Sequence, residues 1–210
     1  MKKNCTEVVF VLDRSGSMCG LEKDTIGGFN SLINKQKKQD VEVLVSTVLF
    51  NDSSVVIHDR KPIDEVRLMT NKDYEVYGCT ALLDALGSSI RHIGNVHKYA
   101  RNEDVPEHTM FVIITDGMEN ASRYYSKERV KSMIEYEKEK YGWEFLFLAA
   151  NMDAIDTASQ YGIDKDHAVN YQCDSVGTRL NYEVLDEAIQ CICSGVPLSK
   201  SWKSKIEKRK

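Results

Sequence analysis

The fold of this 210-residue chain is decided by one stretch, Val8-Val-Phe-Val-Leu-Asp-Arg-Ser-Gly-Ser17. The first five residues are apolar and rich in valine, which is typical of a strand whose two faces are both buried in a sheet. The next five residues are polar and contain Gly16, so we expect the strand to end in a tight loop. The crevice beyond the carboxyl ends of parallel strands is where open α/β sheets bind their ligands, so this loop is a candidate site.

Beyond this stretch, short apolar runs alternate with longer stretches of helical period, which indicates an α/β fold with a mainly parallel sheet. We expect strands at residues 7–12, 41–50, 55–58, 110–115, 144–149 and 167–171. We expect helices at residues 21–37, 80–93, 126–140, 154–161 and 176–193, the third of them capped by Ser126. Residues 59–78 are polar and are expected to be irregular. The turn at residues 51–54 predicts a hairpin, which makes the third strand antiparallel and places it at an edge.

A single domain over residues 1–193 accounts for nearly the whole chain, because it contains no internal repeat and no low-complexity linker. Residues 194–210 are expected to form a basic tail. Its six basic residues are Lys200, Lys203, Lys205, Lys208, Arg209 and Lys210. Such a tail is typically solvated and frayed, and the alternative is a weak docking arm for an acidic surface.

The composition argues against several classes of function. The formal net charge of -4 argues against a nucleic-acid-binding protein, which usually carries a basic domain. No stretch approaches the roughly 20 apolar residues that a membrane-spanning helix needs. The apolar run at residues 8–12 is too short for a signal peptide, and the six cysteines form no Cys-x-x-Cys pair. We therefore expect free thiols and a cytoplasmic location, and we assign no chemistry to the five scattered histidines.

Oxygen-bearing side chains follow two of the expected strands. Asp13, Ser15 and Ser17 come directly after the first strand, and Asp116 lies in a Thr-Asp-Gly motif at the end of the fourth. Thr80, which begins an expected helix, offers a third hydroxyl. If the first and fourth strands are neighbours, their loops face each other at the switch point of the sheet. Several hydroxyls with few carboxylates suit Mg²⁺ or Mn²⁺, which keep water at their remaining positions.

The number of carboxylates indicates what such a metal ion would do. Two carboxylates balance the charge of a divalent ion, whereas three or four would leave the site negative and would repel an anion. The ion therefore stays electrophilic, and an open coordination position can accept a carboxylate from outside. The sequence favours a cation that binds the acidic side chain of a partner protein over a cation that is fully enclosed.

The same residues resemble the metal-ion-dependent adhesion site (MIDAS) of von Willebrand factor A (VWA) domains. Phe10-Val-Leu-Asp-Arg-Ser-Gly-Ser-Met18 and Thr80-Ala-Leu-Leu-Asp84 are most similar to the compact, prokaryotic, intracellular members, and the resemblance covers roughly residues 5–193. It implies a doubly wound, Rossmann-like, six-stranded sheet with one antiparallel edge strand. It implies direct metal contacts from the three hydroxyls and contacts often through water from the two aspartates, with Ca²⁺ compatible beside Mg²⁺ and Mn²⁺. The implied ligands are Asp13, Ser15, Ser17, Thr80 and Asp116.

Several residues beside these five have two readings. Arg14 either assists a bound carboxylate or faces solvent, and Glu119 is either a residue of the partner-binding rim or a solvated loop carboxylate. Asp84 is better explained by the dipole at the start of its helix than by a metal. Cys19 and Cys79 are poor ligands for magnesium and are expected to be small packing residues.

Three functions compete. The first is a non-enzymatic binding module whose metal captures an Asp or Glu of a partner protein. The second is a subunit or adaptor of a larger ATPase or chaperone-like complex. The third is a metal-dependent phosphohydrolase, which is disfavoured because Ser15 occupies the place of a second aspartate after Asp13. The chain also contains neither a Walker A sequence nor a Gly-x-Ser-x-Gly elbow.

Overall fold

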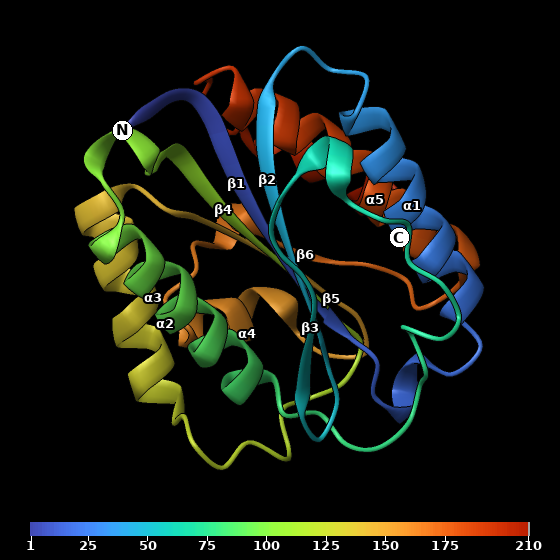
Figure 1. Ribbon diagram of the computed structural model, residues 1–210. Coiled ribbons are helices and arrows are strands. Elements are labelled where there is room, and N and C mark those ends of the chain that lie inside the picture. The colour runs from blue at the N-terminus through green and yellow to red at the C-terminus, as the bar shows by residue number, and fades with distance from the viewer. Residues whose placement is uncertain (210) are drawn as a thin grey trace.

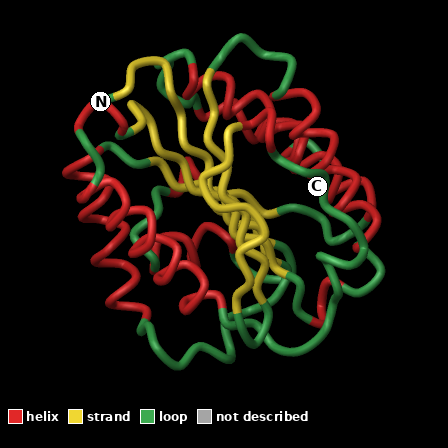
Figure 2. Tube along the Cα trace, viewed as in Figure 1, coloured by secondary structure: helices red, strands yellow, loops and turns green. Residues whose placement is uncertain are grey.

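Six strands form one sheet in the order β3-β2-β1-β4-β5-β6 in the computed structural model, which describes residues 1–209. Only the β2–β3 pair is antiparallel, so β3 is an antiparallel edge strand, as predicted. Figures 1 and 2 show this sheet between two layers of helices, which confirms the predicted fold class. The strands are β1 (Lys2–Asp13), β2 (Glu42–Phe50), β3 (Ser54–Pro62), β4 (Pro106–Thr115), β5 (Glu144–Ala149) and β6 (Ala168–Asn170).

The helices divide between the two faces of the sheet. One face is covered by α1 (Glu22–Gln36) and α5 (Ser175–Cys193), and the other by α2 (Leu82–Tyr99), α3 (Lys127–Tyr141) and α4 (Ala154–Gln160) (Figure 1). As predicted, Ser126 caps α3 by accepting a hydrogen bond from the amide of Arg129. A short helix, α6 (Ser204–Glu207), follows near the C-terminus. The 3-10 turns are η1 (Gly16–Met18), η2 (Ile63–Glu65), η3 (Asn102–Asp104), η4 (Lys165–His167) and η5 (Lys200–Lys203).

Strand β1 shows why its sequence is apolar without interruption. Val8, Phe10 and Leu12 belong to the core beneath α1 and α5, whereas Val9 and Val11 belong to the core beneath α2, α3 and α4. Successive side chains of a strand point to opposite faces, so a strand covered on both faces needs apolar residues at every position.

The chain reverses its direction of travel across the sheet between β1 and β4. These two strands are parallel neighbours, with Leu12 opposite Ile114. From β1 the chain proceeds through α1 to β2 on one side, and from β4 it proceeds through α3 to β5 on the other. The loops that follow β1 and β4 therefore diverge and leave a crevice at the carboxyl end of the sheet.

Strand β3 is longer than predicted, because residues 59–62 continue the strand instead of forming an irregular segment. Arg60 adopts a positive φ of 46° where the pairing of β3 with β2 shifts register. Its guanidinium pairs with the fully buried carboxylate of Glu7 in β1, at 2.7 Å. The partner of Arg60 lies 53 positions away, so the sequence around Arg60 resembles a polar loop. This explains why residues 59–62 were wrongly predicted to be irregular.

The basic tail packs on the domain, in contrast to the expectation of a solvated and frayed segment. Trp202 and Ile206 are only 5% and 4% exposed and join the core beneath α5. The indole of Trp202 donates to the carbonyl of Asp166, and the ammonium of Lys203 donates to the carbonyl of Ala168 in β6. The tail thus covers the short edge strand of the sheet. Lys210, which we counted in the tail, lies outside the described residues.

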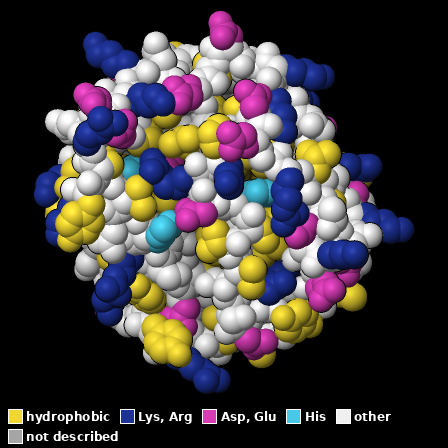
Figure 3. Space-filling model, viewed as in Figure 1, with side chains coloured by type: hydrophobic (Ala, Val, Ile, Leu, Met, Phe, Trp, Pro, Cys, Tyr) yellow, Lys and Arg dark blue, Asp and Glu magenta, His cyan; other side chains and the backbone are white. Residues whose placement is uncertain are grey.

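The surface carries charges of both signs. Figure 3 shows acidic and basic side chains interspersed over one face of the molecule. Within residues 1–209, the helices are too short or too polar to cross a membrane.

Candidate metal centre

The side chains of Ser15, Ser17 and Asp116 meet at the carboxyl end of the sheet. The hydroxyl of Ser17 donates to Asp116 Oδ1 at 2.5 Å and lies 3.0 Å from the hydroxyl of Ser15. A serine hydroxyl has one proton, so Ser15 must donate in the serine pair. The hydroxyls of Ser15 and Ser17 and the carboxylate of Asp116 therefore form a continuous series of contacts, although Ser17 and Asp116 are 99 positions apart in the chain.

Gly117 brings Thr80 into the same cluster. A Cβ atom built on Gly117 would stand 2.9 Å from the hydroxyl oxygen of Thr80, 3.0 Å from that of Ser17 and 3.7 Å from that of Ser15. The three hydroxyls therefore surround one point, and that point is open only because residue 117 has no side chain.

Asp13 lies beneath these hydroxyls and is almost completely buried. Its Oδ1 accepts a hydrogen bond from the amide of Ser15 at 2.7 Å, and its Oδ2 accepts one from the hydroxyl of Thr115 at 2.6 Å. Burial raises the pKa of Asp13, and the hydrogen bonds from Thr115 and Ser15 oppose this shift. Each carboxylate oxygen has two lone pairs, so Asp13 keeps acceptor capacity toward the cluster.

Thr115 is a positioning residue that the sequence reasoning missed. Its hydroxyl donates to Asp13 and also accepts from the amide of Gly117 at 3.3 Å, so it links the end of β1 to the loop after β4. The signal was present in the Thr-Asp-Gly motif, where we considered only the aspartate as a site residue.

Thr80 is held by the loop after β4, and it does not begin helix α2 as predicted. Helix α2 starts at Leu82, and the residue at its N-cap, Ala81, makes no capping bond with a side chain. Asn120 fixes Thr80 through two hydrogen bonds. The side-chain Oδ1 of Asn120 accepts from the backbone amide of Thr80 at 2.9 Å, and the backbone amide of Asn120 donates to the carbonyl of Thr80 at 3.0 Å. The hydroxyl of Thr80 is thereby left free to face the cluster.

The carboxylates of Glu119 and Asp84 accept hydrogen bonds from backbone amides, so neither carboxylate is free in solvent. The four acceptor contacts of Glu119 come from the amides of Leu83, Ala121 and Ser122 and from the hydroxyl of Ser122, at 2.8–3.0 Å. Glu119 therefore caps α2, satisfying an amide that helix geometry leaves open. Asp84 accepts from the amides of residues 123, 124 and 125, each at 2.8 Å. Both carboxylates join α2 to the loop after β4.

Arg14 does not face solvent, which excludes one of its two readings. Its side chain is buried, and its guanidinium lies 5.6 Å from the centre of the Tyr77 ring. The amide of Tyr77 donates to the carbonyl of Arg14 at 3.1 Å. Arg14 therefore supports the loop that carries Tyr77.

The cysteines near the centre differ from the expectation of small packing residues. All six cysteines are free thiols, and Cys19 and Cys79 are exposed. Cys173, which the sequence reasoning did not single out, donates to Asp116 Oδ2 at 3.3 Å. Burial and then the neighbouring Asp116 raise the pKa of Cys173 to about 11, so its thiol stays protonated at neutral pH and acts as a donor.

Most of the exposed residues around the cluster are uncharged, and Asp52 is an exposed carboxylate beside them. Tyr77 and Met118 are the large side chains among them and are 53% and 70% exposed. The neighbouring Asp52 accepts a hydrogen bond from the amide of Cys79 at 3.1 Å. Within residues 16–20, 77–80 and 117–120, the exposed residues are Gly16, Ser17, Cys19, Gly20, Tyr77, Gly78, Cys79, Met118 and Asn120.

The donor set fits a hard divalent cation. Three hydroxyls surround an opening that a single methyl group would fill, and the carboxylates of Asp13 and Asp116 are bonded to Ser15 and Ser17. Across residues 1–209, no three His, Cys, Asp or Glu side chains are grouped to hold a metal, so this centre depends on hydroxyl oxygen. Oxygen donors suit Mg²⁺ or Mn²⁺ better than softer metals.

Neither a family model nor a curated protein matches this sequence, but solved structures do. The vWF domain of the type V pili tip protein Mfa5 from Porphyromonas gingivalis matches with a TM-score of 0.64 and 10% identity, covering 92% of this chain and 97% of that chain. Proximal thread matrix protein 1 from the mussel byssus, with a zinc-occupied MIDAS motif, matches with a TM-score of 0.60 and 14% identity over 90% of this chain. A von Willebrand factor type A protein from Catenulispora acidiphila matches with a TM-score of 0.56 and 12% identity over 88% of this chain.

The chain spans 47% of the length of the mussel protein and 42% of the Catenulispora protein, so it corresponds to one part of each. The shared part is the six-stranded sheet with its helices, and the predicted resemblance in fold is confirmed. This chain has the fold of von Willebrand factor A domains.

Proposed function

We propose that this chain is a divalent-metal-dependent protein-binding module, in which a metal ion captures an Asp or Glu carboxylate of a partner protein. The observation that carries this proposal is the convergence of three hydroxyls on the opening at Gly117. The zinc-occupied MIDAS motif of the mussel protein supports it. The residues that would hold the ion are Asp13, Ser15, Ser17, Thr80 and Asp116.

The charges of the centre favour an anionic partner group. A divalent ion would be balanced by Asp13 and Asp116, so its free coordination position would attract a carboxylate and not repel it. Glu119 and Asp84 keep their negative charges, which the backbone amides bonded to them stabilise. We propose Mg²⁺ or Mn²⁺ as the ion, with Ca²⁺ as the alternative.

The exposed residues around the centre define the partner further. Tyr77 and Met118 offer exposed aromatic and thioether surface beside the centre, and such residues often anchor interfaces. We therefore propose that the captured acidic residue is flanked by apolar residues. A polyacidic segment would gain nothing from this rim.

The phosphohydrolase alternative is disfavoured because Ser15 stands where such an enzyme would need a second aspartate after Asp13. A subunit or adaptor role in a larger complex is compatible with the proposed module, since such a role also consists of binding a partner.

The test measures metal uptake first and carboxylate capture second. Calorimetry with Mg²⁺ and Mn²⁺ is expected to detect one site in the wild-type chain and none in Asp13→Ala. The control is Asp40→Ala, which removes an exposed carboxylate in the turn before β2, at the amino end of the sheet. Absence of uptake in the wild-type chain would contradict the proposal.

A random peptide library then identifies the captured group. We expect the peptides retained in Mg²⁺ to share one Asp or Glu between apolar residues and to be released by chelator. Replacing that acid by Asn or Gln should weaken binding at least about tenfold, which is 1.4 kcal/mol. Retention that is unaffected by chelator would count against metal-mediated capture.

A further inference from the structure

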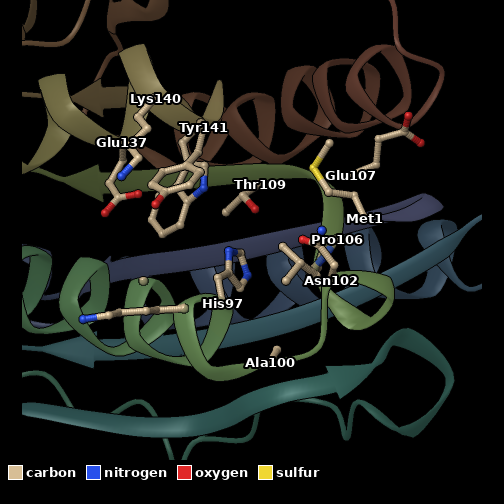
Figure 4. A pocket seen from close by; sticks show the side chains of 14 residues that line it. Met1, His97, Ala100, Asn102, Pro106, Glu107, Thr109, Glu137, Lys140 and Tyr141 are labelled. Carbon is tan, nitrogen blue, oxygen red and sulfur yellow. The ribbon is translucent and has the colours of Figure 1, made fainter.

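A second cavity lies at the opposite end of the sheet from the metal centre. It has a volume of about 430 Å³ and is bounded by the last turns of α2 and α3, by the first residues of β4 and by Trp143, which precedes β5. Figure 4 shows Glu137, Lys140 and Tyr141 of α3 on one side and His97 of α2 on the other, with Thr109 of β4 between them. None of these residues belongs to the metal centre.

Glu137 is the group in this cavity that lacks a partner. Its Oε2 is buried and accepts no hydrogen bond, and its Oε1 lies 3.3 Å from the position of a Cβ atom built on Gly94. Burial raises the pKa of Glu137, whereas the nearby His97 and Lys140 lower it. An unsatisfied acceptor destabilises a fold, so a ligand that donates to the carboxylate of Glu137 would be stabilised there.

The basic side chains around the cavity are already engaged elsewhere. Lys140 donates to the phenol oxygen of Tyr136 at 2.6 Å and lies over the rings of Tyr136 and Tyr141. Lys98 lies over the ring of Tyr99, 5.3 Å from its centre. Within residues 1–209, neither Lys98 nor Lys140 lies within ion-pair distance of Glu137, although the charge of Lys140 acts on its carboxylate.

The remaining wall is rigid and aromatic. His97 is fixed by the buried carboxylate of Glu7, at 2.6 Å, and its ring meets the ring of Trp143 edge to face at 5.4 Å. Trp143 also stacks on Phe111 in the core at 5.4 Å. Aromatic faces attract cations and pack against flat apolar groups.

The ends of two helices add to the negative potential. Both α2, which ends at Tyr99, and α3, which ends at Tyr141, direct their carboxyl-terminal turns at the cavity. A helix carries a partial negative charge at this end, which stabilises a nearby cation. The carboxylate of Glu137, the aromatic wall and the two helix ends favour positive charge, and they act against the charges of Lys98 and Lys140 at the same cavity.

We propose that this cavity binds a small molecule that places a primary ammonium group against Glu137 and an apolar body against Trp143. The ammonium would pair with the carboxylate of Glu137, which lines the cavity, and the cavity is large enough for one aromatic ring with a short chain. This proposal does not depend on the proposed metal function, because the two sites share no residue.

The test compares two probes of the same shape. 2-Phenylethylammonium carries the charge, and 2-phenylethanol has a neutral hydroxyl in its place. Titration followed by amide NMR shifts should show the ammonium probe binding at residues of the cavity at least about tenfold more tightly than the alcohol. Equal affinities, or no binding of either probe, would overturn the proposal.

Two variants of the same helix then locate the charge. Glu137→Gln should weaken binding of 2-phenylethylammonium at least about tenfold and leave binding of the alcohol unchanged. Glu139→Gln removes an exposed carboxylate two residues away and should change neither. An equal loss in both variants would mean that only the overall charge of α3 attracts the probe and would also overturn the proposal.

Discussion

At the scale of single residues, Gly117 stands at the point where the three hydroxyls of the metal centre meet. In Gly117→Ala, the new methyl carbon would lie 2.9 Å from the hydroxyl oxygen of Thr80, closer than a normal contact. We expect this variant to lose metal affinity at least about tenfold, as measured by calorimetry with Mg²⁺.

Gly27→Ala is the matched control for this prediction. Gly27 lies in α1, and a Cβ atom at this position meets no other atom within 4 Å. Alanine is favoured over glycine inside a helix by about 1 kcal/mol, so Gly27→Ala should be slightly more stable and should bind metal normally. Equal metal affinity in the two variants would contradict the role of Gly117.

A second residue-scale prediction concerns the pH dependence of stability at His58, which is 4% exposed and lies 3.0 Å from the hydroxyl of Thr47. Burial, followed by the charge of Arg67, lowers the pKa of His58 below its ordinary 6.5. As the pH falls below 6.5, the unfolded chain takes up a proton at this residue before the folded chain does, so the free energy of unfolding should decrease.

Urea unfolding at pH 7.5 and pH 5.5 checks this prediction, with His58→Leu as the comparison. The substitution adds a constant offset in stability, and only the change between the two pH values is informative. We expect the decrease toward low pH to be smaller in His58→Leu. The same decrease in both chains would show that His58 takes up its proton equally in the folded and unfolded states.

At the scale of elements, the junction between α2 and the loop after β4 controls where Thr80 stands. Asp84→Ala would leave the amides of Arg123, Tyr124 and Tyr125 without their acceptor. These amides would exchange their bonds to Asp84 for bonds to water, and local opening of the loop would become more frequent. Hydrogen exchange at these three amides should accelerate in Asp84→Ala.

Asp84→Asn retains one acceptor oxygen and should show intermediate exchange. The amide of Val130 inside α3, which is bonded to the carbonyl of Ser126, should exchange at its wild-type rate in both variants. Acceleration spread equally over all four amides would indicate general destabilisation of the domain and not a local role for Asp84.

The same junction shows how far the sequence can predict this molecule. Periodicity identified each of the six strands and the five long helices, because both faces of the sheet are buried and the helices are amphipathic. It placed the start of α2 two residues early, because Glu119 caps that helix from a loop 36 positions away. Spacing along the chain likewise predicted the five candidate ligands but not Thr115, Asn120 and Cys173, whose contacts arise only after the strands have paired.

At the scale of the whole molecule, the tail tests whether residues after α5 belong to the folded unit. Trp202 is 5% exposed and packs with Ile206 on the core, whereas Val196 is 52% exposed. Replacing a buried tryptophan by alanine usually costs about 3–5 kcal/mol, while exposed positions change stability by roughly 0.5 kcal/mol or less. Trp202→Ala should therefore lower the urea midpoint strongly, and Val196→Ala should not. A solvated tail would instead give the same midpoint for both variants, and that result would exclude packing of the tail over the β6 edge of the sheet.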